Sequence, residues 1–107
     1  MKLSWHKIPT TTWFQMPQKQ QLLNVAAELA RVSVGIARYG HRDQITRGAY
    51  ERAFDLIDLT LEDSRWESQS LQWRYLRDVL ASLYQGGGDR AVLNFLYNWL
   101  VKTSENI

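Results

Sequence analysis

The chain contains no cysteine, which excludes disulfide bonds, thiolate metal sites and a cysteine nucleophile. Its two prolines, Pro9 and Pro17, both stand near the N-terminus, so no proline interrupts the chain from residue 18 onward. No apolar run approaches the roughly 18 to 20 residues that a membrane-spanning helix requires. The first nine residues also lack the continuous apolar core of a signal peptide. We therefore expect a cytoplasmic protein that does not enter a membrane.

The chain also lacks a strong excess of charge of either sign. Its 13 lysines and arginines against 11 acidic residues leave a net charge of +2, which is too small by itself to indicate a nucleic-acid partner. The 107 residues, 45% of them hydrophobic, have the composition of an ordinary globular protein. This length predicts one domain around a single core.

Residues 1–17 are predicted to form an extended N-terminal arm that Pro9 and Pro17 bracket. The three consecutive threonines at 10–12 are β-branched and have poor helix propensity. The arm carries several large apolar side chains, which we expect to hold it against the rest of the domain: Trp5, Ile8, Trp13 and Phe14.

Residues 18–107 are predicted to form a helical domain, because four segments show the apolar periodicity of amphipathic helices. The predicted helices span residues 18–39, 43 or 46 to 63, 68–85 and 90–102. Gly40 and the glycine triplet at 86–88 are expected to end the first and third helices, and Asp89 is expected to cap the fourth. No convincing pair of strands is present. The pattern therefore predicts an all-α fold, an antiparallel four-helix bundle-like domain with an extended N-terminal arm.

The first predicted helix is apolar over most of its circumference and should be covered on two sides. One of its apolar faces consists mostly of small residues, which would allow a second helix to approach closely: Leu23, Ala27, Ala30 and Val34. Its polar positions form one narrow stripe, which we assign to solvent: Asn24, Glu28, Arg31, Gly35 and Arg38.

The second predicted helix carries four carboxylates at spacings of four, three and four residues: Glu51, Asp55, Asp58 and Glu62. This spacing places them on one stripe, which is either an acidic metal site of an enzyme or the solvated side of a helix. The stripe lies nearly opposite the centre of the apolar face on the helical wheel, and neither histidine completes the Glu-x-x-His pattern of metal-binding bundles. We interpret the stripe as a solvated face and predict no metal, no cofactor and no catalytic residue. A metal-dependent enzyme is the less favoured alternative.

The turn after the first helix gathers cationic side chains: Arg38, His41, Arg42 and, slightly further on, Arg47. Beside a helix N-terminus, these residues are candidates for binding a phosphate, a nucleic acid or an acidic partner. The structural alternative is that Arg38 complements the helix dipole, Gly40 ends the first helix and Asp43 caps the second.

Five tryptophans and five tyrosines exceed what a small bundle comfortably buries, and aromatic residues are enriched at interfaces. We therefore predict a protein-binding or self-assembly module that forms a homodimer. The expected contact surface combines part of the arm with the small-residue face: Trp13, Phe14, Leu23, Ala27, Ala30 and Val34. The alternative function is nucleic-acid or phosphate-ligand binding through Arg38, His41, Arg42 and Arg47.

Overall fold

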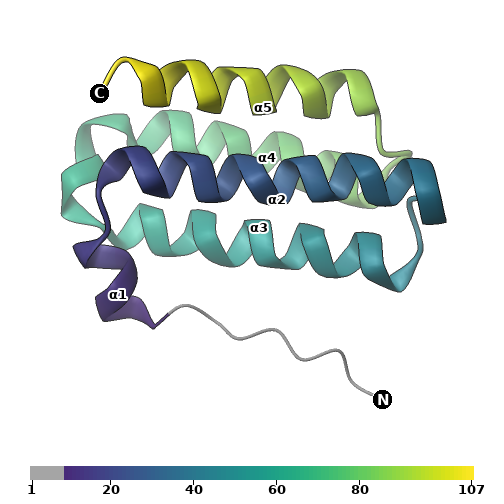
Figure 1. Cartoon of the computed structure of the whole chain (residues 1–107), viewed down its shortest axis with the longest axis horizontal. Coiled ribbons are helices and arrows are strands. Elements are labelled where there is room, and N and C mark those ends of the chain that lie inside the picture. Colours follow the sequence, from purple (N-terminus) through teal and green to yellow (C-terminus); the bar gives the residue numbers. More distant parts are fainter. Residues whose placement is uncertain (1–8) are drawn as a thin grey trace.

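The computed structural model describes residues 9–107, which form a helical domain (Figure 1). The elements are α1 (Thr10–Gln15), α2 (Gln18–Tyr39), α3 (Gln44–Glu62), the 3-10 helix η1 (Ser64–Gln69), α4 (Ser70–Gln85) and α5 (Arg90–Glu105). This part of the chain contains no strand. The predicted all-α fold is therefore confirmed, and the four predicted helices correspond to α2, α3, α4 and α5.

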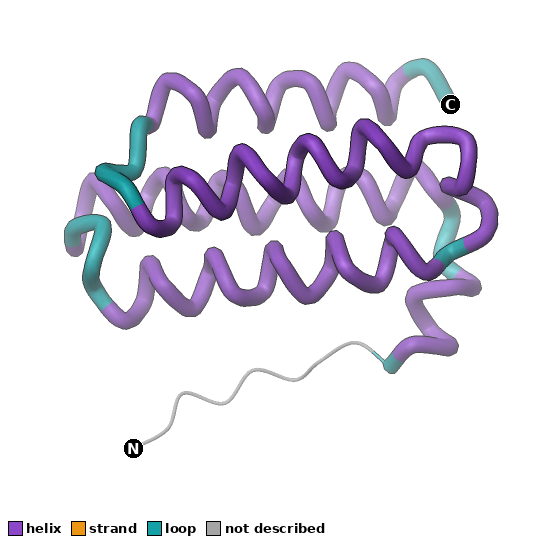
Figure 2. The backbone as a smooth tube through the Cα atoms, turned by 180° about the vertical axis from the view of Figure 1, so that it is seen from behind, coloured by secondary structure: helices purple, strands orange, loops and turns teal. Residues whose placement is uncertain are grey.

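The four long helices run alternately in opposite directions; short turns join α2 to α3 and α4 to α5, and η1 connects α3 to α4 (Figures 1 and 2). Helix α2 packs against both α3 and α5, and α4 packs on α3. The backbones of α4 and α5 scarcely approach each other, although these helices are consecutive in the chain. The bundle is therefore open along its α4–α5 side. Within residues 9–107, none of the helices combines the length and the apolar character needed to cross a membrane.

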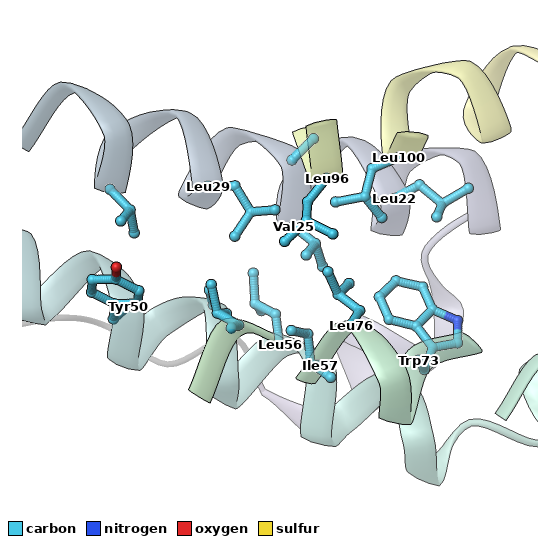
Figure 3. Close-up of a cluster of buried hydrophobic side chains, with 14 of the residues drawn as sticks. Leu22, Val25, Leu29, Tyr50, Leu56, Ile57, Trp73, Leu76, Leu96 and Leu100 are labelled. Carbon is cyan, nitrogen blue, oxygen red and sulfur yellow. The ribbon is translucent and has the colours of Figure 1, made fainter. Parts of the chain in front are cut away.

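All four long helices contribute side chains to one hydrophobic core (Figure 3). Burying one such side chain contributes about 1.5–3 kcal/mol, so the core is the main stabilising feature of the bundle. The residues at its centre are almost completely inaccessible to solvent: Leu22, Val25, Leu29, Tyr50, Ile57, Trp73, Leu76 and Leu100.

The helices begin and end at the capping residues that the sequence predicts. Gly40 follows the last residue of α2. The Asp43 carboxylate accepts a hydrogen bond from the backbone N–H of Ile45 at 2.9 Å, and the Asp89 carboxylate accepts one from Ala91 at 2.9 Å. These carboxylates partner N–H groups that the first turn of a helix leaves free.

The prediction of an extended arm is wrong for Thr10–Gln15, which form α1. The turn starts where the carbonyl of Pro9 accepts the N–H of Trp13 at 3.0 Å. The low helix propensity of threonine costs only about 0.5 kcal/mol per residue, and the complete burial of the Trp13 side chain outweighs this cost. Trp5 and Ile8, also expected to hold the arm, lie outside the described residues.

A buried polar network joins α1 to the adjoining end of the bundle. The indole N–H of Trp13 donates to Thr60 Oγ1 at 3.2 Å. The wholly buried Gln21 donates to the Trp13 carbonyl at 2.8 Å and to Asp63 Oδ2 at 3.0 Å. Its own side-chain carbonyl accepts the indole N–H of Trp66 at 2.6 Å. The periodicity of the sequence identified neither Gln21 nor Asp63 as a structural residue, because these partners are 42 residues apart in the chain.

Asp63 carries the negative charge of this network. Its carboxylate accepts hydrogen bonds from the backbone N–H of Arg65 at 3.0 Å and from the Arg65 guanidinium at 2.7 Å. The guanidinium is the main cause that lowers the pKa of Asp63 from 3.8 to about 2, and the bond from Gln21 acts in the same direction. Asp63 is therefore ionised throughout the physiological pH range.

Two positions of the predicted polar stripe on α2 are buried, so its assignment to solvent is wrong there. Glu28 pairs with Arg31 and Arg52, the Nε of Arg52 lying 2.7 Å from Glu28 Oε2. Gly35 faces Thr46 of α3, and a Cβ atom at Gly35 would lie 2.6 Å from Thr46 Oγ1. In the sequence, these two residues look like positions on a solvent-exposed edge, because neither is apolar. The pattern does not reveal that one belongs to a buried ion pair and the other to a close helix contact.

The close approach at Gly35 leads to a test of how α2 packs on α3. Gly35→Ala should lower the free energy of unfolding by about 1–3 kcal/mol, because the added methyl group forces α2 and α3 apart. Gly48→Ala is the matched control: its Cβ would meet only Arg52 Nη1 at 3.5 Å, so it should gain about 0.5–1 kcal/mol of helix propensity. Chemical denaturation measures both. Equal effects of the two substitutions would contradict the close contact.

The ion pair of Asp63 should make stability depend on pH. Because its native pKa of about 2 lies below the ordinary value of 3.8, its contribution is complete above about pH 4 and is lost as the pH falls towards 2. Asp63→Asn should cost about 1–2 kcal/mol at neutral pH, and its difference from the unmodified chain should shrink between about pH 4 and 2. Urea unfolding at several pH values measures this, with the exposed Glu67→Gln as the control for one lost charge. A difference that stays constant with pH would show that the charge of Asp63 is unimportant.

Candidate functional site

The four basic residues predicted to form an anion-binding turn divide into two pairs. His41 and Arg47 both contact the carbonyl oxygen of Tyr84 in the last turn of α4. His41 Nε2 lies 3.2 Å from this oxygen, and Arg47 Nη1 donates to it at 2.7 Å. Arg38 and Arg42 are exposed. The structure therefore does not gather all four side chains around one site.

The contacts of His41 and Arg47 tie the C-terminal end of α4 to the start of α3. The carbonyl of Tyr84 is among those that the end of a helix leaves without an intrahelical partner, and the helix dipole favours positive charge there. The guanidinium carbon of Arg47 also lies 3.5 Å from the centre of the Tyr84 ring. These interactions are those of a structural clamp that engages His41 Nε2 and Arg47 Nη1 within the fold.

An aromatic cluster supports this clamp from inside the bundle. The ring of Tyr50 packs edge-on against His41 and Tyr84, with centroid distances of 5.4 and 5.2 Å. Burial raises the pKa of the Tyr50 hydroxyl to about 12, although the charge of Arg47 acts in the opposite direction. Tyr50 is therefore neutral at physiological pH.

The carboxylate stripe lies along the side of α3 next to α4. Asp58 forms an ion pair with Arg77 of α4, the Arg77 Nε lying 2.6 Å from Asp58 Oδ1, and this bond raises the pKa of Arg77. Glu51 and Glu62 are exposed, and Asp55 is half-buried. Within residues 9–107, histidines and carboxylates form no group of three or more that could hold a metal ion. Glu51, Asp55 and Asp58 line an open pocket of about 330 Å³ together with Arg77.

The surface predicted to form a dimer contact is only partly accessible. Trp13 is completely buried within one chain, so it has no surface to offer a second copy. Phe14 is exposed on α1, and Val34 is exposed on α2. The remaining members of the small-residue face are half-buried: Leu23, Ala27 and Ala30.

The most exposed large apolar side chains of the described residues lie elsewhere, beside the open α4–α5 side of the bundle. Leu71 and Tyr75 of α4 are 76% and 69% exposed, and Phe95 of α5 is 70% exposed. They border a groove of about 450 Å³, whose lining also includes the core residues Leu76 and Leu96. The lining is completed by Gln72 and Trp99 and contains no charged residue.

Sequence reasoning missed this groove because it did not single out the apolar residues Leu71 and Tyr75 of α4. Leu71 and Tyr75 stand four residues apart, so they are neighbours on the helix surface, beside the buried seam of Trp73 and Leu76. A second apolar face on one amphipathic helix was the signal that could have revealed it.

The chain matches no known protein family, and neither the curated proteins nor the solved structures include a significant match. The choice among the candidate surfaces therefore depends on their geometry, exposure and charge.

The clamp around Tyr84 requires a close approach of the turn before α5, which can be tested with two adjacent glycines. Gly88 has a positive φ of 72°, and a Cβ atom there would clash with the imidazole ring of His41. Gly88→Ala should therefore lower the free energy of unfolding by about 1–3 kcal/mol. Gly87→Ala is the control, since nothing lies within 4 Å of its added methyl group, and it should change stability by less than about 0.5 kcal/mol. Thermal unfolding compares the two, and a harmless Gly88→Ala would contradict the described packing of His41.

Proposed function

We propose that this protein is a self-assembly module that forms a homodimer through the groove between α4 and α5. The observation that carries the proposal is the exposure of Leu71, Tyr75 and Phe95 beside an apolar groove. Contiguous apolar surface of this kind on a folded domain marks interaction sites. Full burial of each side chain would contribute about 1.5–3 kcal/mol, so three per chain are a substantial driving force.

The absence of charge in the lining supports a second copy as the occupant of the groove. Two identical patches face each other in a twofold dimer, so a net charge on the patch would face an equal net charge of the same sign. The lining of this groove has no charged side chain, so two copies meet here without repulsion. The same patch also offers both exposed rings, Tyr75 and Phe95, and a hollow of suitable apolar character to receive them.

The packing order of the helices supports the same proposal. Helix α4 is covered by α3, and α5 is covered by α2, but α4 and α5 scarcely cover each other. Helices from a second copy would cover both exposed edges at once. In this proposal the main contact surface differs from the α2 face that the sequence favoured. The cytoplasmic location and the absence of a cofactor remain predictions.

Sedimentation velocity at micromolar concentrations tests this proposal. The unmodified chain should sediment as a dimer, and Leu71→Glu or Phe95→Glu should raise the dissociation constant at least about tenfold, because each places a carboxylate in an apolar contact. Both residues are largely exposed, so the variants should retain the helical circular dichroism and the unfolding midpoint of the monomer.

Ile45→Glu is the matched control, because Ile45 is an exposed apolar residue of similar type that lies outside this groove. It should leave the dimer intact. A monomeric unmodified chain at about 100 µM, or equal weakening by Ile45→Glu and Phe95→Glu, would refute the proposed interface.

A further inference from the structure

A second apolar groove lies between α2 and α3 and has a different electrostatic character. Its volume is about 300 Å³, and its exposed apolar side chains are Val34, Tyr39 and Ile45. Three arginines line the same groove: Arg31, Arg38 and Arg52. This groove contains part of the small-residue face of α2, namely Ala30 and Val34.

The arginines of this groove are incompletely neutralised within the chain. Arg31 and Arg52 share one carboxylate, that of the buried Glu28, and the Arg31 side chain is still 62% exposed. Arg38 is exposed and forms no ion pair with any residue of the described part of the chain. Three arginines against one carboxylate leave an excess of two positive charges beside an apolar surface.

This excess of positive charge argues against a second copy as the occupant of the groove. A twofold contact through it would bring the arginines of both chains together, and like charges across an interface are strongly unfavourable. The uncharged α4–α5 groove has no such penalty. The two grooves are therefore suited to different partners.

The apolar lining argues against a nucleic acid. Binding to a phosphate backbone depends on several free cations, and here only Arg38 lacks a carboxylate partner. Tyr39 offers one ring on which a base could stack, but Val34 and Ile45 offer neither a ring nor a hydrogen bond. An occupant that carries both apolar side chains and carboxylates can pack on the apolar residues of the groove and pair with its arginines.

We propose that the α2–α3 groove binds an acidic amphipathic helix of a partner protein. Apolar side chains of the partner, spaced at i, i+3 or i+4 and i+7, pack between Val34, Tyr39 and Ile45. Carboxylates beside them pair with Arg31 and Arg38, whose guanidinium groups suit planar pairing with carboxylates. This site is separate from the proposed dimer surface, since the two grooves have no lining residue in common.

Fluorescence anisotropy with designed peptides tests the proposal on the full chain. The probe is a labelled helical peptide with leucines along one stripe and glutamates on both flanks. Two further probes are the same peptide with glutamine in place of glutamate, and a single-stranded RNA oligonucleotide. The glutamate peptide should bind at least about tenfold more tightly than the glutamine peptide at low salt, and this preference should decrease as salt is added. Tighter binding of the RNA than of the glutamate peptide would overturn the proposal in favour of a nucleic-acid site.

Substitutions locate the binding on the protein. Arg38→Glu should weaken binding of the glutamate peptide by about fivefold or more, whereas Arg74→Glu, the same charge change at an exposed position of α4, should not. Val34→Ser should weaken both the glutamate and the glutamine peptide, because it removes apolar contact without changing charge. Equal effects of Arg38→Glu and Arg74→Glu, or unchanged affinity in Val34→Ser, would overturn the proposed site.

The outcome is independent of the proposed dimer. Phe95→Glu should retain binding of the glutamate peptide, and Arg38→Glu should retain the sedimentation behaviour of the unmodified chain. Loss of peptide binding in Phe95→Glu would place the peptide in the α4–α5 groove and refute the α2–α3 assignment.

Discussion

The packing of α2 against α3 on one side and α5 on the other is the constraint on which the rest of this structure depends. Helix α2 is apolar over most of its circumference, so it needs cover on two sides. The absence of a side chain at Gly35 lets α3 approach closely, with Thr46 against the backbone of α2. With α3 and α5 both committed to α2, α4 packs on α3, and the α4–α5 side stays open. The exposed apolar groove is thus a consequence of how the central helix is covered.

Both ends of the bundle are held by polar contacts between segments far apart in the sequence. At one end, Gln21 joins Trp13, Asp63 and Trp66. At the other, His41 and Arg47 converge on the carbonyl of Tyr84. These contacts decide which charges remain available at the surface. Arg47 has a structural role, because it bonds to the Tyr84 carbonyl. Arg38 is exposed beside an apolar groove and is therefore a candidate binding residue.

Much of the helical architecture could be predicted from local patterns, because amphipathic periodicity and capping residues act within a few positions. The bounds of α2 and the caps at Asp43 and Asp89 were accessible in this way. The helix α1 was not, since its threonines argue against a helix and it is stabilised by tertiary contacts, chiefly the burial of Trp13. The buried position of Glu28 was hidden for a similar reason: its partner Arg52 lies 24 residues away.

The sequence by itself therefore determined the fold class, the positions of the long helices and the excess of apolar and aromatic side chains. The tertiary structure decided where that excess is exposed. Leu71 and Tyr75 form a second apolar face of α4 in the sequence, but the arrangement of α4 and α5 decides that they and Phe95 lie at the surface. Trp13 is the opposite case: it was expected at an interface but lies in the core, because α1 folds back onto α3. Periodicity reports which face of a helix is apolar, whereas the arrangement of neighbouring helices determines whether that face is covered.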